Sequence, residues 1–147
     1  MDHGVAGTID TGGNQWTFSC KYDAIEDSDS CSFITGQQFM ILMPGGHDVF
    51  VSWGFRRFPG SEMIARFDNQ VPIWTKSNDG WTATQSATIF RRMIGGKIMR
   101  YRWSDWPEEN DHDGTIDLTN FRDTAALMEA IFSEFQVIRI GGDLELR

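Results

Sequence analysis

Residues that build metal and redox sites are scarce in this chain. Among 147 residues there are two cysteines, Cys20 and Cys31, and the three histidines are scattered at positions 3, 47 and 112. Ten residues separate the cysteines, whereas redox catalysts use the CxxC spacing and structural zinc sites need four close ligands. The acidic clusters at 23–29 and 111–113 lack the spacing of a calcium loop or a second nearby histidine. The sequence therefore predicts no metal site and no cofactor.

The common catalytic motifs are absent as well. The chain has no GxSxG, HExxH or Walker phosphate-loop pattern, and its serines have no persuasive base nearby in sequence. A non-enzymatic protein is therefore the favoured reading. One motif opposes it, because residues 9–12 (Ile-Asp-Thr-Gly) resemble the hydrophobic-Asp-Thr-Gly signature of aspartic proteases. In that reading Asp10 acts with a second aspartate, most simply from a dimer partner.

Long hydrophobic runs are missing too. No segment approaches the roughly 20 apolar residues that cross a bilayer. Residues 1–7 also lack the charged and then hydrophobic segments of a secretion signal. We therefore expect a soluble chain without a membrane span, and a secreted location would require a leader removed ahead of Met1.

Aromatic residues, by contrast, are abundant. Six Trp and eleven Phe, with 40% hydrophobic residues overall, provide enough apolar area for one packed core. The length predicts a single domain over residues 1–147, with flexible ends at 1–13 and 141–147.

The two cysteines lie at the inner ends of two alternating segments. Residues 15–20 and 31–35 alternate apolar and polar side chains around an acidic turn, which predicts a hairpin over 15–36. Such a hairpin brings Cys20 and Cys31 close enough for a disulfide. Disulfides persist mainly in oxidising compartments, so a bridge favours the periplasm or the cell exterior, and free thiols would favour the cytoplasm.

Turn signals divide the rest of the chain into short elements. We expect strands at 39–43, 49–55, 63–67, 71–74, 99–103, 115–118 and 137–140, and a polar loop at 107–114. A short helix at about 86–95 would begin at Ser86 and end at a left-handed Gly95, and a covering helix at about 120–135 would follow Asn120. This pattern predicts a mainly β (α+β) fold with an antiparallel sandwich or barrel-like core.

Charge is distributed unevenly. The net charge is −8, yet residues 56–102 hold nine Lys or Arg and only three acids. Arginine and aromatic side chains together can hold phosphate and stack on bases. The plainer alternative is that these arginines pair with acids of the same fold, and the overall acidity opposes polyanion binding. The candidate anion-binding residues are Arg66, Arg91, Arg92, Arg100 and Arg102.

Residues 53–58 are the first candidate surface for a protein partner, because Trp, Tyr and Arg are enriched in binding hot spots. The candidates are Trp53, Phe55, Arg56, Arg57 and Phe58. Replacing Arg56 and Arg57 with serine is expected to weaken partner capture without unfolding the domain.

Several motifs follow one another in a defined order along the chain: Trp16, Cys20 and Cys31, then residues 87–97, the strand to Trp103, and residues 115–121 and 125–130. This order resembles the invasion-associated locus B family of bacterial secreted or periplasmic proteins. The likeness is strongest over residues 81–132. The family typically has a further cysteine pair in its middle, which this chain lacks. The resemblance implies a β-sandwich with small helices and an extracytoplasmic accessory protein, and it carries over no catalytic residue.

Two main functional readings follow. The leading one is a non-enzymatic, extracytoplasmic bacterial domain that binds a protein partner. The alternative is a cytoplasmic or phage-derived regulator that binds nucleic acid or a nucleotide through the arginine-rich middle. Salt discriminates between them, because phosphate-mediated binding falls steeply as salt rises.

Overall fold

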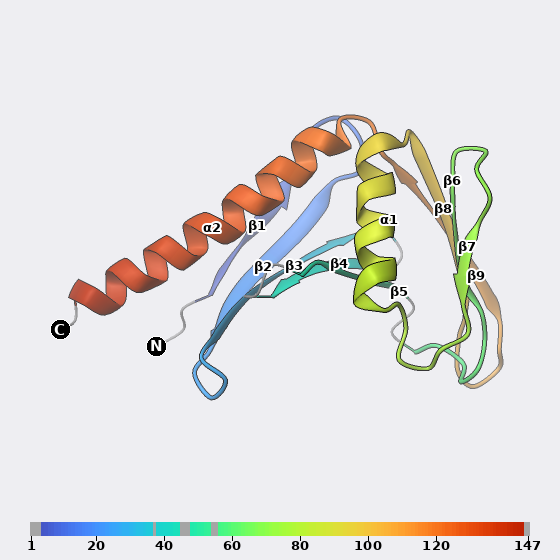
Figure 1. Ribbon diagram of the computed structural model, residues 1–147, viewed down its shortest axis with the longest axis horizontal. Coiled ribbons are helices and arrows are strands. Elements are labelled where there is room, and N and C mark those ends of the chain that lie inside the picture. The colour runs from blue at the N-terminus through green and yellow to red at the C-terminus, as the bar shows by residue number, and fades with distance from the viewer. Residues whose placement is uncertain (1–3, 37, 45–47, 54–55, 146–147) are drawn as a thin grey trace.

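The described part of the chain folds into two antiparallel sheets and two helices (Figure 1). The computed structural model describes residues 4–36, 38–44, 48–53 and 56–145. One sheet has five strands in the order β1-β2-β3-β4-β5, and the other has four in the order β7-β6-β8-β9. In chain order the elements are β1 (Val5–Ile9), β2 (Trp16–Asp23), β3 (Ser28–Thr35), β4 (Phe39–Pro44), β5 (Phe50–Trp53), β6 (Met63–Phe67), β7 (Ile73–Thr75), α1 (Ala83–Gly95), β8 (Ile98–Ser104), β9 (Asp111–Asp117) and α2 (Phe121–Glu145).

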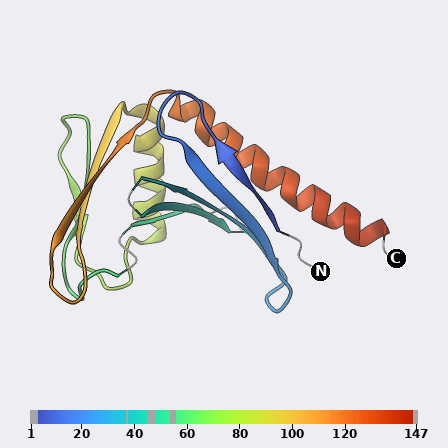
Figure 2. The ribbon, with the colours of Figure 1, turned by 180° about the vertical axis from the view of Figure 1, so that it is seen from behind.

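The two sheets share one core, so the architecture is sandwich-like and not a closed barrel. Figures 1 and 2 show α2 running along the five-stranded sheet, the four-stranded sheet on the other side of the molecule, and α1 near their junction. Phe39 of β4 has its ring centroid 5.4 Å from that of Tyr101 of β8, and Trp53 of β5 lies 5.6 Å from the same ring. The mainly β, α+β class predicted from the sequence is confirmed.

The predicted hairpin and its disulfide are both present. β2 and β3 pair antiparallel, and Cys20 stands directly opposite Cys31. The two sulfurs form a disulfide, and both cysteines are fully buried. Successive side chains of a strand point to opposite faces, and the cysteines lie on the face that points into the core. Trp16, Cys20 and Phe33 are all buried on this face.

Helix α1 begins earlier than the sequence pattern suggested. Thr82 is the N-cap, and its side chain and that of Gln85 form a reciprocal capping box. Ser86, the predicted cap, is instead fully buried inside the helix, where its Oγ accepts the Val51 N–H at 3.2 Å. Gly95 is the last helical residue and does not adopt the left-handed conformation. Ser86 thus ties the helix to the edge strand β5.

Helix α2 begins after Asn120, as predicted, but continues through Glu145. The predicted strand at 137–140 is therefore wrong. A short apolar run is compatible with both the helical and the strand pattern of side chains. A helix satisfies its backbone hydrogen-bonding groups internally, without a neighbouring strand. In the described part of the chain neither helix is long and apolar enough to cross a membrane. An apolar stripe along one side of α2 is buried or half-buried against the core. The stripe consists of Phe121, Ala125, Met128, Phe132 and Phe135.

Two strands lie where the sequence pattern indicated loops. β1 extends into residues 7–14, which have the glycine-rich composition of a loop, and β9 covers half of the predicted loop at 107–114. Glycines and acidic residues made both segments resemble turns. Each strand is an edge of its sheet, where such residues are tolerated. The flexibility predicted for the two ends of the chain stays a prediction.

A cross-strand aromatic ring explains the glycine in each of these edge strands. Gly7 pairs with Phe18, and Gly114 pairs with Tyr101. A Cβ atom at Gly7 would stand 2.9 Å from the Phe18 ring, and one at Gly114 would overlap the Tyr101 ring. The rings occupy the space that a side chain would need.

Replacing Gly114 with alanine is therefore expected to lower the free energy of unfolding by about 1–3 kcal/mol, because Tyr101 must leave its packed position. Chemical denaturation measures the change. Gly95→Ala is the matched control, since nothing lies within 4 Å of a Cβ there and alanine favours a helix. Equal stability of Gly114→Ala and the parent would contradict the assigned packing.

Candidate binding site

The residues predicted to bind a partner do not form one exposed surface in the structure. Trp53 is only 1% exposed and its Nε1 donates to the Arg102 carbonyl at 3.2 Å, so it belongs to the core and not to a contact surface. Phe55 lies outside the described residues. Arg56 is exposed, and Arg57 and Phe58 are half-buried. Two different hollows flank this segment.

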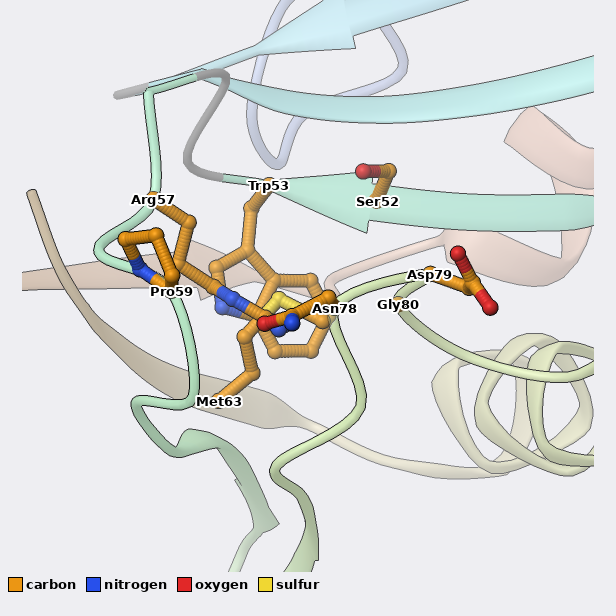
Figure 3. A pocket seen from close by; sticks show the side chains of 8 residues that line it. All are labelled: Ser52, Trp53, Arg57, Pro59, Met63, Asn78, Asp79 and Gly80. Atoms are coloured by element: carbon orange, nitrogen blue, oxygen red, sulfur yellow. The ribbon is translucent and has the colours of Figure 1, made fainter. Parts of the chain in front are cut away.

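The first hollow has Arg57 on its wall (Figure 3). The guanidinium donates to the Ser77 carbonyl, and Asn78 accepts the Gly60 N–H at 2.7 Å, so the facing loops are tied together. Burial lowers the pKa of Arg57 below its ordinary value. In Figure 3 the Arg57 guanidinium lies beside Asn78, and the Asp79 carboxylate points away from it. The hollow of about 430 Å³ is lined by Ser52, Trp53, Arg57, Pro59, Met63, Asn78, Asp79 and Gly80.

The second hollow contains Arg56 and an aromatic cluster. Trp106 is 51% exposed and its ring lies 5.4 Å from Phe58. His112 Nε2 is 2.7 Å from an Asp105 carboxylate oxygen, and this hydrogen bond lowers the pKa of Asp105. The cluster at 111–113 lies in strand β9 and not in a loop, and no group of three metal-ligating side chains occurs among the described residues.

The predicted anion-binding arginines fall into two groups. Arg66 of β6 and Arg100 and Arg102 of β8 lie on one face of the four-stranded sheet. Arg91 and Arg92 belong to α1 and are not part of that face. The alternation of buried residues in β6 and β8 shows that the face points away from the core.

Arg66 and Arg100 stand directly opposite each other in the β6–β8 pair. Both are exposed, and no carboxylate oxygen of a described residue lies within 4.0 Å of either guanidinium. Like charges placed opposite in a sheet are destabilising. The juxtaposition of Arg66 and Arg100 therefore costs stability, and neither guanidinium forms an ion pair with a described carboxylate.

Arg102, two residues from Arg100 in the same strand, does form an ion pair. Arg102 stands opposite Asp113, and its Nε and Nη2 donate to the two carboxylate oxygens at 2.6 and 3.0 Å. This hydrogen bonding raises the pKa of Arg102 and lowers that of Asp113. The same strand thus carries one paired arginine and, two residues away, one unpaired arginine.

Apolar side chains border the unpaired arginines. Trp74 of β7 is 55% exposed and stands opposite Ile64, on the same face. A hollow of about 350 Å³ lies over this face and includes Ile64, Pro72 and Thr115 in its lining. We call this surface the arginine face and define it by Ile64, Arg66, Trp74, Arg100 and Arg102.

The proposed protease residue has a local role in the structure. Asp10 is exposed after β1, and its carboxylate accepts the Gly12 N–H at 3.1 Å. The adjacent Thr11 bonds to Thr124 of α2 through their hydroxyls at 2.6 Å. No hydrogen bond joins Asp10 to a second aspartate among the residues that the structure describes. The motif therefore positions the loop against the helix.

Comparison with known proteins adds no further constraint. No protein-family model matches the chain, and neither does any curated protein or solved structure. The functional argument therefore depends on the geometry of the described surfaces.

Proposed function

We propose that this protein is a non-enzymatic binding domain that holds a protein partner at the arginine face. The observation that carries the proposal is that Arg66 and Arg100 stand opposite each other beside the exposed Trp74. Neither arginine forms an ion pair with a described carboxylate. A carboxylate of a partner would relieve the repulsion between the two guanidinium groups. An adjacent apolar side chain of the partner would cover Trp74, and this combination of Arg and Trp is typical of hot spots.

An acidic protein segment fits this surface better than a nucleic acid does. Exposed carboxylates of β9, namely Asp111, Asp113 and Asp117, border the arginines on the same sheet, and the chain has a net charge of −8. A long polyanion would meet these carboxylates and be repelled, whereas a short acidic group would reach only the arginines. Nucleic-acid binding remains the alternative that the experiment below distinguishes.

We also propose an extracytoplasmic location. The buried Cys20 to Cys31 disulfide supports it, because such bridges persist mainly in oxidising compartments. The resemblance to the invasion-associated locus B family supports the same location. The earlier expectation for Arg56 and Arg57 stays a prediction about a second surface.

Short fluorescent peptides with two glutamates flanking an aliphatic residue provide the test, with glutamine analogues and single-stranded DNA as comparisons. We expect the glutamate peptide to bind more tightly than its glutamine analogue. Arg66→Ser with Arg100→Ser should weaken that binding about tenfold, because two charge-assisted contacts are lost. Fluorescence anisotropy measures the affinities.

Arg91→Ser with Arg122→Ser is the matched control, since both arginines are exposed and lie on helices away from the arginine face. It removes the same charge and should leave peptide binding unchanged. Equal binding of the glutamate and glutamine peptides would overturn the proposal. Tighter binding of DNA, with a steep loss at high salt, would support the alternative function instead.

A further inference from the structure

The hairpin β2–β3 projects beyond its neighbours and ends in an acidic turn. Pairing of β1 with β2 reaches only Cys20, and pairing of β4 with β3 reaches only Ser30. The β2–β3 ladder continues to the pair of Asp23 and Ser28, past the described parts of both neighbours. Figures 1 and 2 show this loop extending from the body of the molecule. We call residues 23–28 the acidic tip.

Hydrogen bonds hold the acidic tip in a defined shape. The Asp23 carboxylate accepts the N–H groups of Ile25 at 2.9 Å and Glu26 at 3.3 Å. The Tyr22 hydroxyl donates to Asp27 at 2.6 Å. An ordered turn loses less conformational entropy when it binds than a disordered loop would lose.

The acidic tip also presents an apolar side chain to solvent. Ile25 is 96% exposed, more than any other exposed large hydrophobic residue that the structure describes. Asp23, Glu26 and Asp27 surround it in sequence and are exposed as well. The tip therefore presents two groups that would complement the arginine face: carboxylates for Arg66 and Arg100, and an aliphatic side chain for Trp74.

We infer that the acidic tip of one copy binds the arginine face of a second copy. The inference rests on the proposed function of the arginine face. A second copy is the partner because the carboxylates and the exposed Ile25 of its acidic tip complement the arginines and Trp74 of the face. The tip lies on the far side of the molecule from the four-stranded sheet, so it cannot reach its own arginine face (Figure 1). A reciprocal exchange, in which each copy binds its tip to the face of the other, closes as a two-fold dimer, whereas a one-way contact forms a ring or a longer head-to-tail assembly.

Two defective variants test this contact. Ile25→Ser with Glu26→Gln removes the tip contact while keeping the hydrogen bonds of Asp23 and Asp27. Arg66→Ser with Arg100→Ser removes the face contact. We expect sedimentation velocity at low salt to show concentration-dependent assembly of the parent protein and an association constant at least about tenfold lower for each variant alone. About 0.5 M salt should also weaken assembly of the parent.

A mixture of the two variants gives the decisive result. The tip variant keeps an intact face and the face variant keeps an intact tip, so an equimolar mixture should form a one-to-one heterodimer that grows no further. Val137→Ser with Glu129→Gln is the matched control for the tip variant, because both residues are exposed on α2. Arg91→Ser with Arg122→Ser is the control for the face variant, and both controls should assemble as the parent does.

Three results would overturn the inference. These are a parent protein that stays monomeric at all concentrations, a tip variant that assembles normally, or a mixture that forms no heterodimer. In each case the glutamate-peptide experiment still decides the proposed function, because it uses the arginine face without the tip. Equal thermal unfolding of all variants excludes misfolding as the cause.

Discussion

Replacing Trp53 with alanine is expected to lower the free energy of unfolding by about 3–5 kcal/mol. The Trp53 ring lies 5.5 Å from Phe39, 5.6 Å from Tyr101 and 5.2 Å from Trp81, so it joins both sheets and the segment before α1. Its removal creates a cavity bordered by three other rings and also leaves the Arg102 carbonyl without the indole donor.

Urea denaturation without reductant measures this loss, and for a chain of this size it corresponds to a fall in the melting temperature of roughly 6 to 20 °C. Trp53→Phe keeps a ring but not the hydrogen bond, so its loss should be intermediate. Trp74→Ala is the matched control, because that ring is 55% exposed, and it should change stability little. Similar losses for Trp53→Ala and Trp74→Ala would show that Trp53 is not a core residue.

Trp53 also shows what sequence patterns could and could not predict. Within the strand predicted at 49–55, alternation places Val51 and Trp53 on one face, and the hairpin predicted over 15–36 is the observed β2–β3 pair. Alternation did not show which face is buried. The composition of residues 53–58 suggested a binding surface, whereas the sheet turns Trp53 inward.

The complete arginine face could not be predicted from local sequence patterns, for a different reason. In the strand predicted at 99–103, alternation places Arg100 and Arg102 on the same side, and in the structure both are exposed on the outer face. Arg66 joins them only because β6 pairs with β8, although β7 and α1 lie between these strands in sequence. Pairing between strands that are not consecutive depends on the packing of the whole fold. The contrast between paired Arg102 and unpaired Arg100 likewise requires the register with β9.

The errors at the ends of elements have a common physical cause. Ser86 has the chemistry of a helix cap, but Thr82 and Gln85 form the better reciprocal pair, and the helix extends to them. Residues 137–140 can form a strand only if a neighbouring strand accepts their backbone groups. Continuation of α2 satisfies those groups within the helix itself.

Removal of the disulfide is expected to lower the free energy of unfolding by about 2–4 kcal/mol. Cys20 and Cys31 lie opposite each other in the ladder, and the bridge limits the freedom of the hairpin loop in the unfolded chain. Denaturation of Cys20→Ala with Cys31→Ala measures the loss. Reduced parent protein is the companion sample, because it loses the bridge but keeps both sulfur atoms in the core.

The burial of both sulfurs also predicts how the bridge responds to reductant. Because Cys20 and Cys31 are 0% exposed, a thiol can attack the disulfide only after β2 and β3 separate locally. Native protein should therefore resist mild reductant that reduces the unfolded chain readily, as measured by intact mass after thiol alkylation. Rapid reduction of the native protein would contradict the buried placement. In protein taken from its natural host, an intact bridge would support the extracytoplasmic location, and two free thiols would favour the cytoplasmic alternative.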